Sequence, residues 1–282
     1  MKNLKFLMFA LVLFLVLPFC GKKENAKKLP VDLKLEFNPP QPKDAYILKM
    51  KYSWTAKPGF SLGDDYWVYV HFWDLHSKSM YLVDDHKPPV EFSRWRPGEE
   101  ISYERVLVLP EYIEDIRGDS FPVNLSIGFY NPGTGDKIEV LRKNLKIKIN
   151  PEILPQKIYA EGWYGEETDS SGRTWRWMSR VAVCRVENPR KVSFLYLEGF
   201  FPTRFLPDQK LRVFVNDKLL AEITEPTFKK LYEISPEMMG DGDEFILRFE
   251  AEKSFVPAQV SKDSTDKREL AVAFYKVFFC VK

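Results

Sequence analysis

Apolar residues recur at every second position in short runs of this chain, and this spacing constrains the fold more than any other feature. Within Tyr46–Trp54, one face of an extended chain carries large apolar side chains: Tyr46, Leu48, Met50, Tyr52 and Trp54. Lys49, Lys51 and Ser53 fall on the other face, with Ile47 as the exception. A period of two is that of a strand with one buried side. Because similar runs continue to the C-terminus without a convincing amphipathic helix, we expect an all-β protein of antiparallel sheets.

The length of 282 residues is enough for two domains of ordinary size. With 45% hydrophobic and 15% aromatic residues, each domain can bury a sizeable core. Two prolines in a short stretch, Pro151 and Pro155, are typical of a boundary between domains. We therefore predict a first β-sandwich over residues 32–150, a linker over 151–157 and a second β-sandwich over 158–282.

The expected strands follow the apolar runs between turn residues. In the first sandwich, after the strand over Tyr46–Trp54, they are Tyr66–Trp73, Met80–Val83, Ile101–Leu109, Val123–Tyr130, Lys137–Val140 and Leu145–Ile149. In the second they are Ile158–Tyr164, Thr174–Met178, Val181–Val186, Val192–Gly199, Leu211–Val215, Leu219–Ile223, Phe228–Ile234, Phe245–Ala251 and Leu270–Val281.

The N-terminal segment has the layout of an export signal. Lys2 and Lys5 precede an uncharged apolar run, Phe6–Phe19, which is shorter than the roughly 20 residues that span a bilayer. Cys20 follows, and this arrangement resembles a bacterial lipoprotein signal, although Phe19 stands where small residues are usual. The resemblance implies that residues 1–20 are a signal peptide with its lipidated cysteine, Cys20. An uncleaved anchor and a secreted protein remain as alternatives.

The lysine-rich residues 21–31 lack apolar periodicity and are expected to form a flexible tether. We expect a lipid bilayer to be a partner through palmitate or a similar chain on Cys20. The protein would then be exported to the outer membrane or cell surface, with the periplasmic face as the alternative. Possible further partners are a glycan or an envelope protein.

Charge excludes one class of partner. The chain has 42 basic and 40 acidic residues, and loss of Lys2 and Lys5 with the leader leaves 40 against 40. Such a neutral chain has no basic field for nucleic acid. Besides Cys20, the chain has Cys184 and Cys280. In an exported protein these two can form a disulfide, but both lie in apolar runs, so two buried free thiols are the alternative.

Four motifs in the first half of the chain support a family resemblance: Val68–Asp74, Asp85–Pro89, Trp95–Glu99 and Gly128–Gly135. They resemble accessory β-domains of bacterial surface proteins and of some membrane glycosyltransferases. The resemblance implies an immunoglobulin-like, non-catalytic module without a known site.

All three histidines, His71, His76 and His86, lie in this half near aspartates. Imidazole and carboxylate groups bind metals, and pairing of strands could bring His71 beside His86. Because no HExxH motif or helical histidine pair is present, we expect hydrogen-bonded structural histidines and no metal.

The second half resembles the galactose-binding-like jelly rolls. The residues that support this resemblance are Gly162–Tyr164 with Glu167, Arg173–Trp177, Val213–Asn216, Phe255–Ala258 and Arg268–Val272. Some modules of this kind bind glycans and others are spacers, so the fold alone does not assign a ligand.

Aromatic and charged residues cluster at the start of this second half, and they form the candidate glycan-binding site: Trp163, Tyr164, Glu167, Trp175, Arg176 and Trp177. Sugar rings stack on aromatic planes, and charged groups bind their hydroxyls, in the manner of pockets that mix apolar walls with a few polar groups. We expect, however, that the tryptophans belong to the core and that Arg176 and Glu167 form an ion pair at the rim, so the glycan platform is the alternative.

The sequence contains no G-x-S-x-G elbow, P-loop, C-x-x-C or dinucleotide motif. We therefore expect no enzyme activity and no cofactor. The predicted function is that of a non-catalytic, membrane-anchored envelope lipoprotein whose β-sandwiches serve protein interaction or spacing. The alternatives are a glycan-binding lipoprotein that uses the aromatic platform, and an accessory chain of a glycan-processing system.

Overall fold

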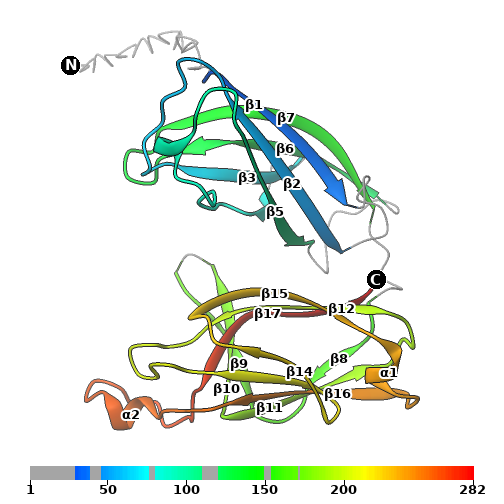
Figure 1. Ribbon diagram of the computed structural model, residues 1–282. Helices are drawn as coiled ribbons and strands as arrows, with labels where there is room; N and C mark the ends of the chain where they lie inside the picture. The colour runs from blue at the N-terminus through cyan, green and yellow to red at the C-terminus, as the bar shows by residue number, and fades with distance from the viewer. Residues whose placement is uncertain (1–28, 39–45, 76–79, 110–119, 149–153, 171) are drawn as a thin grey trace, which may run out of the picture.

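The computed structural model describes residues 29–38, 46–75, 80–109, 120–148, 154–170 and 172–282 (Figure 1). Over these residues the chain is all-β, with antiparallel sheets packed as sandwiches, as the period-two pattern predicts. The predicted signal peptide, Cys20 and most of the tether lie outside the described residues. No helix in the described part of the chain is long and apolar enough to cross a membrane.

The first sandwich places three strands against four, an arrangement of the immunoglobulin type. One sheet has the order β1-β2-β5, with β1 (Val31–Asn38), β2 (Ile47–Ala56) and β5 (Glu100–Val108). The other has the order β4-β3-β6-β7, with β4 (Met80–Val83), β3 (Trp67–Asp74), β6 (Ser120–Tyr130) and β7 (Lys137–Lys148). A 3₁₀ turn, η1 (Phe92–Arg94), precedes β5.

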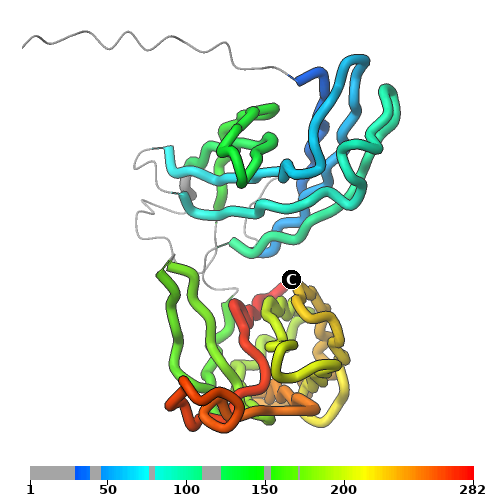
Figure 2. Tube along the Cα trace, turned by 90° about the vertical axis from the view of Figure 1, so that its left-hand side faces the viewer, coloured from blue at the N-terminus to red at the C-terminus, as the bar shows by residue number. Residues whose placement is uncertain are grey.

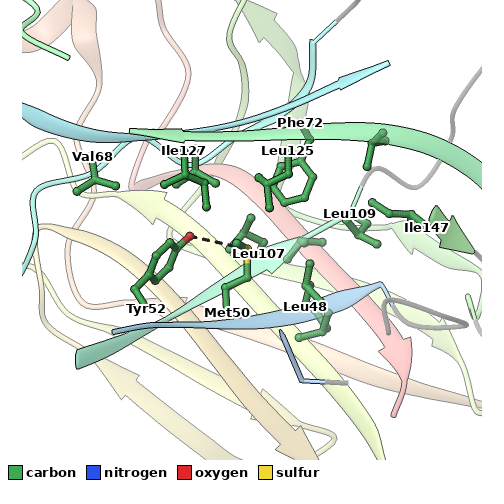
Figure 3. Packing of buried hydrophobic residues seen from close by; sticks show 14 of the residues in the cluster. Leu48, Met50, Tyr52, Val68, Phe72, Leu107, Leu109, Leu125, Ile127 and Ile147 are labelled. Atoms are coloured by element: carbon green, nitrogen blue, oxygen red, sulfur yellow. Dashed lines mark hydrogen bonds between the residues drawn. The ribbon is translucent and has the colours of Figure 1, made fainter. Parts of the chain in front are cut away.

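The inward faces of these two sheets form one apolar core. Figure 3 shows Leu48, Met50 and Tyr52 of β2 facing side chains of β3 and β6, among them Val68 and Ile127. The alternation seen in Tyr46–Trp54 is therefore the alternation between core and outward face. Trp54 is fully buried against Phe129, with 5.0 Å between ring centroids.

Three strand predictions differ from the structure. The single strand expected over Ile158–Tyr164 is two strands, β8 (Lys157–Tyr159) and β9 (Trp163–Thr168), and β1 was not predicted. The structure has a single strand, β7, where two strands over Lys137–Val140 and Leu145–Ile149 were expected. The polar residues between them, Arg142, Lys143 and Asn144, are exposed and pair with β6. β7 lies at the edge of its sheet, where polar residues on an exposed strand are favourable. These three residues interrupt the alternation of apolar and polar positions, so the sequence does not show one continuous strand.

The second sandwich contains two five-stranded sheets, as expected of a jelly-roll type of fold. One has the order β15-β12-β17-β10-β9, with β15 (Thr227–Ile234), β12 (Ser193–Phe200), β17 (Val272–Val281), β10 (Thr174–Met178) and β9 (Trp163–Thr168). The other has the order β14-β13-β16-β11-β8, with β14 (Lys218–Ile223), β13 (Leu211–Val215), β16 (Glu244–Ala251), β11 (Val181–Glu187) and β8 (Lys157–Tyr159). Two short helices, α1 (Pro236–Met239) and α2 (Pro257–Val260), lie in the connections.

The two sandwiches meet through the outward face of the sheet that contains β12 and β17. Tyr196 and Phe278 are buried together with core residues of the first sandwich, and the ring of Phe278 lies 5.8 Å from that of Tyr46. The C-terminus lies at this junction, whereas α2 is at the far end of the second sandwich (Figures 1 and 2). The exact domain boundary remains a prediction, because residues 149–153 lie outside the described ranges.

Cys184 and Cys280 are both free, so the candidate disulfide is not formed. Cys184 belongs to the core of the second sandwich, whereas Cys280 lies among the residues buried at the junction. Burial raises the pKa of each thiol to about 12. The alternative of two buried thiols is the one that the structure contains.

Candidate functional site

Trp175 and Trp177 both point outward from the second sandwich. They alternate with Arg176 along β10, so they share one face of the strand. Neither belongs to the core cluster of this sandwich, and both are partly exposed. They lie on the outward face of the sheet β15-β12-β17-β10-β9, beyond the region that packs on the first sandwich.

Further aromatic side chains extend this surface. The ring of Trp177 lies 5.8 Å from that of Phe200 and 6.5 Å from that of Phe255. Phe200 in turn lies 5.4 Å from Tyr275, and Phe205 stacks on Phe255 at 4.8 Å. All are partly exposed, and 37% of Phe205 is accessible to solvent. We call this surface the aromatic face; its residues are Trp175, Trp177, Phe200, Phe205, Phe255 and Tyr275.

Arginines flank the aromatic face. The guanidinium of Arg173 lies 5.3 Å from the ring of Tyr275, and that of Arg204 lies 5.5 Å from the ring of Phe205. Such cation–π contacts hold a charged donor beside an aromatic plane. An aromatic surface with flanking guanidinium groups can therefore offer both stacking and hydrogen bonding to one ligand.

The buried indole N–H of Trp175 has no hydrogen-bond partner among the described residues. Buried donors of this kind are uncommon in folded proteins. Trp175 therefore carries an unsatisfied buried donor at the aromatic face.

Trp163, which the sequence placed in the same candidate site, is partly buried and packs against the core of the second sandwich instead. Its ring contacts Tyr159, Phe249 and Phe274, with centroid distances of 5.0, 5.5 and 5.5 Å. Its indole Nε1 donates to the carbonyl oxygen of Val183 at 3.0 Å. Trp163 thus has a structural role, and the structure does not bring it to the aromatic face.

Arg176 and Glu167 do not form the expected ion pair. Arg176 donates to the carbonyl oxygen of Tyr164 at 2.6 Å, and its guanidinium lies 4.6 Å from the ring of Tyr159. Glu167 is opposite Trp175 in the strand register and pairs with Arg268 at 2.7 Å. Glu167 shares the face of Trp175, its partner in the register, whereas Arg176 points to the opposite face of β10 because side chains alternate along a strand. The two charged groups are therefore kept apart.

Tyr164 lies beside this ion pair at the margin of the same sheet. Its hydroxyl accepts a hydrogen bond from the backbone N–H of Glu269 at 3.1 Å, and Arg268 lies 5.2 Å from its ring. Arg268 also donates a hydrogen bond to Asp266 and forms an ion pair with it. These contacts join β9 to the segment before β17, so this group of residues fastens the loop that borders the aromatic face.

The histidines do not converge. His86 points inward, where one ring nitrogen lies 2.7 Å from the carbonyl oxygen of Asp84 and the other 2.9 Å from the hydroxyl of Tyr103. His71 points outward from β3 and pairs with Asp85 at 3.1 Å. Since His86 is bridged to the inward-facing Val68 of β3, the two rings lie on opposite faces of this sheet. His76 is outside the described residues. In the described ranges, no three potential ligands are grouped to hold a metal ion.

Sequence reasoning missed Phe200, Phe205, Phe255 and Tyr275 as members of the surface around Trp177. The only local signal is that the segment Phe200–Phe205 contains three phenylalanines outside a regular alternation. Their contact with Trp177 depends on sheet order, because β10, β12 and β17 are far apart along the chain.

No protein-family model matches this chain, and no curated protein does. Weak similarity extends to the secreted serine protease VesC from Vibrio cholerae, with 13% identity over 91% of this chain and 52% of that one, at a TM-score of 0.27. The CBM51-2 and INT domains of ZmpB from Clostridium perfringens follow with 8% identity over 59% of this chain and 38% of that one, at a TM-score of 0.22.

The third similar structure is β-glucuronidase 2 from Bacteroides uniformis, with 11% identity over 89% of this chain and 30% of that one, at a TM-score of 0.27. The chain spans about half of the first of these proteins and less of the other two. A likeness this weak assigns no function, so the function has to be inferred from the residues themselves.

Proposed function

We propose that this chain is an exported, non-catalytic protein, held at a membrane by lipid on Cys20, which binds carbohydrate through the aromatic face of its second sandwich. The observation on which this rests is the contact of Trp177 with Phe200 and Phe255 on an outward, partly exposed sheet surface. Contiguous exposed apolar surface on a globular domain marks an interaction site.

The flanking groups favour a sugar as the ligand. A pyranose ring has an apolar C–H face and a rim of hydroxyl groups, which matches aromatic planes beside a few hydrogen-bond donors. Arg173 and Arg204 supply such donors next to Tyr275 and Phe205. Interaction with an envelope protein is the second candidate function. Phe200, Phe205 and Phe255 of the aromatic face favour it, because their side chains offer apolar contact without hydrogen bonds.

A glycan array probed with the full-length chain tests the proposal. Stacking of a base on an aromatic ring is worth about 1–3 kcal/mol. If a sugar ring gains as much, Trp177→Ala should weaken binding by about fivefold or more. Leu219→Ala is the matched control, because Leu219 is an exposed apolar residue on β14 in the other sheet of the same sandwich. Binding that survives Trp177→Ala unchanged, or no binding by the wild type, would reject the aromatic face as a glycan site.

The anchor is tested separately. Cells grown with labelled palmitate should incorporate the label into the wild-type chain and not into Cys20→Ala. Label in both proteins, or in neither, would contradict lipidation at Cys20. Neither result affects the glycan assay, because the two sites are distant in the sequence.

A further inference from the structure

A hollow of about 690 Å³ lies on the outward face of the four-stranded sheet of the first sandwich. Its volume is in the range of about 300–1,000 Å³ that is usual for small-ligand sites. It is lined by residues of β3, β6 and β7 and by Leu75, which follows β3. The aromatic face belongs to the other sandwich, so the hollow is a separate feature of the molecule.

The strand register explains why the outward surface of the sheet is recessed at this point. Tyr69 of β3 is opposite Gly128 of β6, and the pairing of β6 with β7 shifts between Ile127 and Gly128. A Cβ atom at position 128 would lie 2.7 Å from Cε1 of Tyr69 and would also collide with the carbonyl oxygen of Ile138. Glycine therefore allows the ring of Tyr69 to sit deep in the sheet surface, where it forms the floor of the hollow.

The polar groups around this floor hold one another in place. Ser126 donates to Glu139 at 2.8 Å and lies 3.3 Å from the hydroxyl of Tyr69. Arg142 donates to the same carboxylate through Nε at 2.9 Å. Burial disfavours the charge of Glu139, but the hydrogen bonds from Arg142 and Ser126 outweigh it and lower its pKa. The carboxylate is thus ionised and fixed before any ligand arrives.

One wall of the hollow is apolar. Trp73 is two residues beyond His71 on β3 and contacts its ring edge-on, at 5.8 Å between centroids. Leu75 forms the neighbouring rim, with 40% of its surface exposed. An indole plane next to an aliphatic rim suits the C–H face of a sugar ring.

The charges of the hollow cancel. Lys137 and Arg142 contribute two cations and Glu139 contributes one anion. The second anion, Asp74, is only 6% exposed and accepts a hydrogen bond from the hydroxyl of Tyr81 at 2.5 Å. The lining also includes Asn124, whose side chain donates to Asn144 at 2.8 Å and has both donor and acceptor groups. Such a lining offers donors and acceptors without a net field, which suits hydroxyl groups better than a carboxylate or phosphate.

We infer that this hollow is a binding site for an uncharged sugar unit, with Trp73 against the ring and Asn124, Glu139 and Arg142 at its hydroxyls. The inference goes beyond the proposed function and does not rest on it, because it concerns the first sandwich and none of the residues of the aromatic face.

The test compares two tryptophans of one strand on an array of neutral and acidic glycans, using the full-length chain. Trp73→Ala should weaken binding to neutral glycans at least tenfold. Trp67→Ala should leave it unchanged, because Trp67 is also outward and partly exposed on β3 but does not line the hollow. Leu75→Arg, a change at an exposed rim position, should weaken binding as Trp73→Ala does and should not change the melting temperature.

The outcomes separate this site from the aromatic face. If Trp73→Ala and Leu75→Arg lose binding to a neutral glycan and Trp177→Ala does not, the hollow is supported as the binding site for that glycan and the aromatic face is rejected. Loss in Trp177→Ala alone overturns the hollow and leaves the proposed function intact. Binding of acidic glycans only, equal loss in Trp67→Ala and Trp73→Ala, or no binding at all also overturns the hollow.

Discussion

Asp84 shows how a single buried charge is balanced by groups from both sandwiches. Only 5% of its side chain is exposed, and Arg105 of β5 donates to it at 2.8 Å through Nε. Lys229 of β15, in the second sandwich, lies 3.9 Å away. Burial opposes the ionisation of Asp84, but the hydrogen bonds and charge of Arg105 lower its pKa. The carboxylate is therefore held ionised at the junction.

Removing Arg105 leaves this charge without its main partner. We expect Arg105→Met to lower the free energy of unfolding by about 3–5 kcal/mol, as for other buried pairs that lose one member. Urea denaturation followed by circular dichroism measures the change. Lys57→Met is the control, because the Lys57–Asp32 pair is more than half exposed, and its loss should cost less than about 1 kcal/mol. Similar effects of the two substitutions would contradict this account.

At the scale of an element, β6 depends on a glycine that no side chain can replace. A Cβ at position 128 would meet Tyr69 and the backbone of β7, including Cα of Glu139 at 2.9 Å. Because β6 accommodates the ring of Tyr69 from the neighbouring strand β3 at this position, it has no room for the methyl group of an alanine. The hollow and the stability of the sheet thus share one structural cause.

We expect Gly128→Ala to destabilise the protein by about 1–3 kcal/mol, the usual range for a forced overlap in packed surroundings. Gly165→Ala is the matched control in a strand, β9, because no atom lies within 4 Å of its added Cβ. That change should be neutral or stabilising by up to about 1 kcal/mol. Thermal unfolding of both variants measures the difference, and an equal fall in melting temperature would count against the close packing at Gly128.

At the scale of the whole molecule, the junction between the sandwiches combines apolar contact with titratable groups. Tyr46 and Phe278 meet across it, and Asp84 and His86 lie on the side of the first sandwich. Burial, together with the charge of Arg105, outweighs the nearby carboxylates of Asp84 and Asp85 and lowers the pKa of His86 below its ordinary 6.5. The native protein thus holds His86 neutral.

Acid should therefore weaken the fold in two stages. A group whose pKa is lower in the native state than in the unfolded state stabilises the protein at pH values above the unfolded-state pKa. This contribution is lost as the pH falls towards the native-state pKa. The free energy of unfolding should decrease below about pH 6.5 because of His86, by at most about 1.4 kcal/mol per pH unit, and further below pH 3.8 because of Asp84. Denaturation between pH 7 and 5 tests the first stage. His86→Gln should flatten it, and an unchanged slope in that variant would exclude His86 as the cause.

The candidate site could be predicted only in part from the sequence. Trp175 and Trp177 were assigned to one strand face because alternation is a local property of an extended chain. Their neighbours Phe200, Phe255 and Tyr275 could not be assigned, since sheet order and register bring them together. The same limit applies to Glu167, whose partner is Arg268 and not the nearby Arg176.

By itself, the sequence determined the all-β class, most strand positions and the inward faces of the strands, because these follow from the period of two and from turn residues. Tertiary structure alone decided which outward faces are covered. It buries Tyr196 and Cys280 between the sandwiches, keeps Cys184 apart from Cys280, and leaves Trp73 and Trp177 accessible. The physical reason is that burial of an outward face depends on contacts between distant segments, which no local pattern encodes.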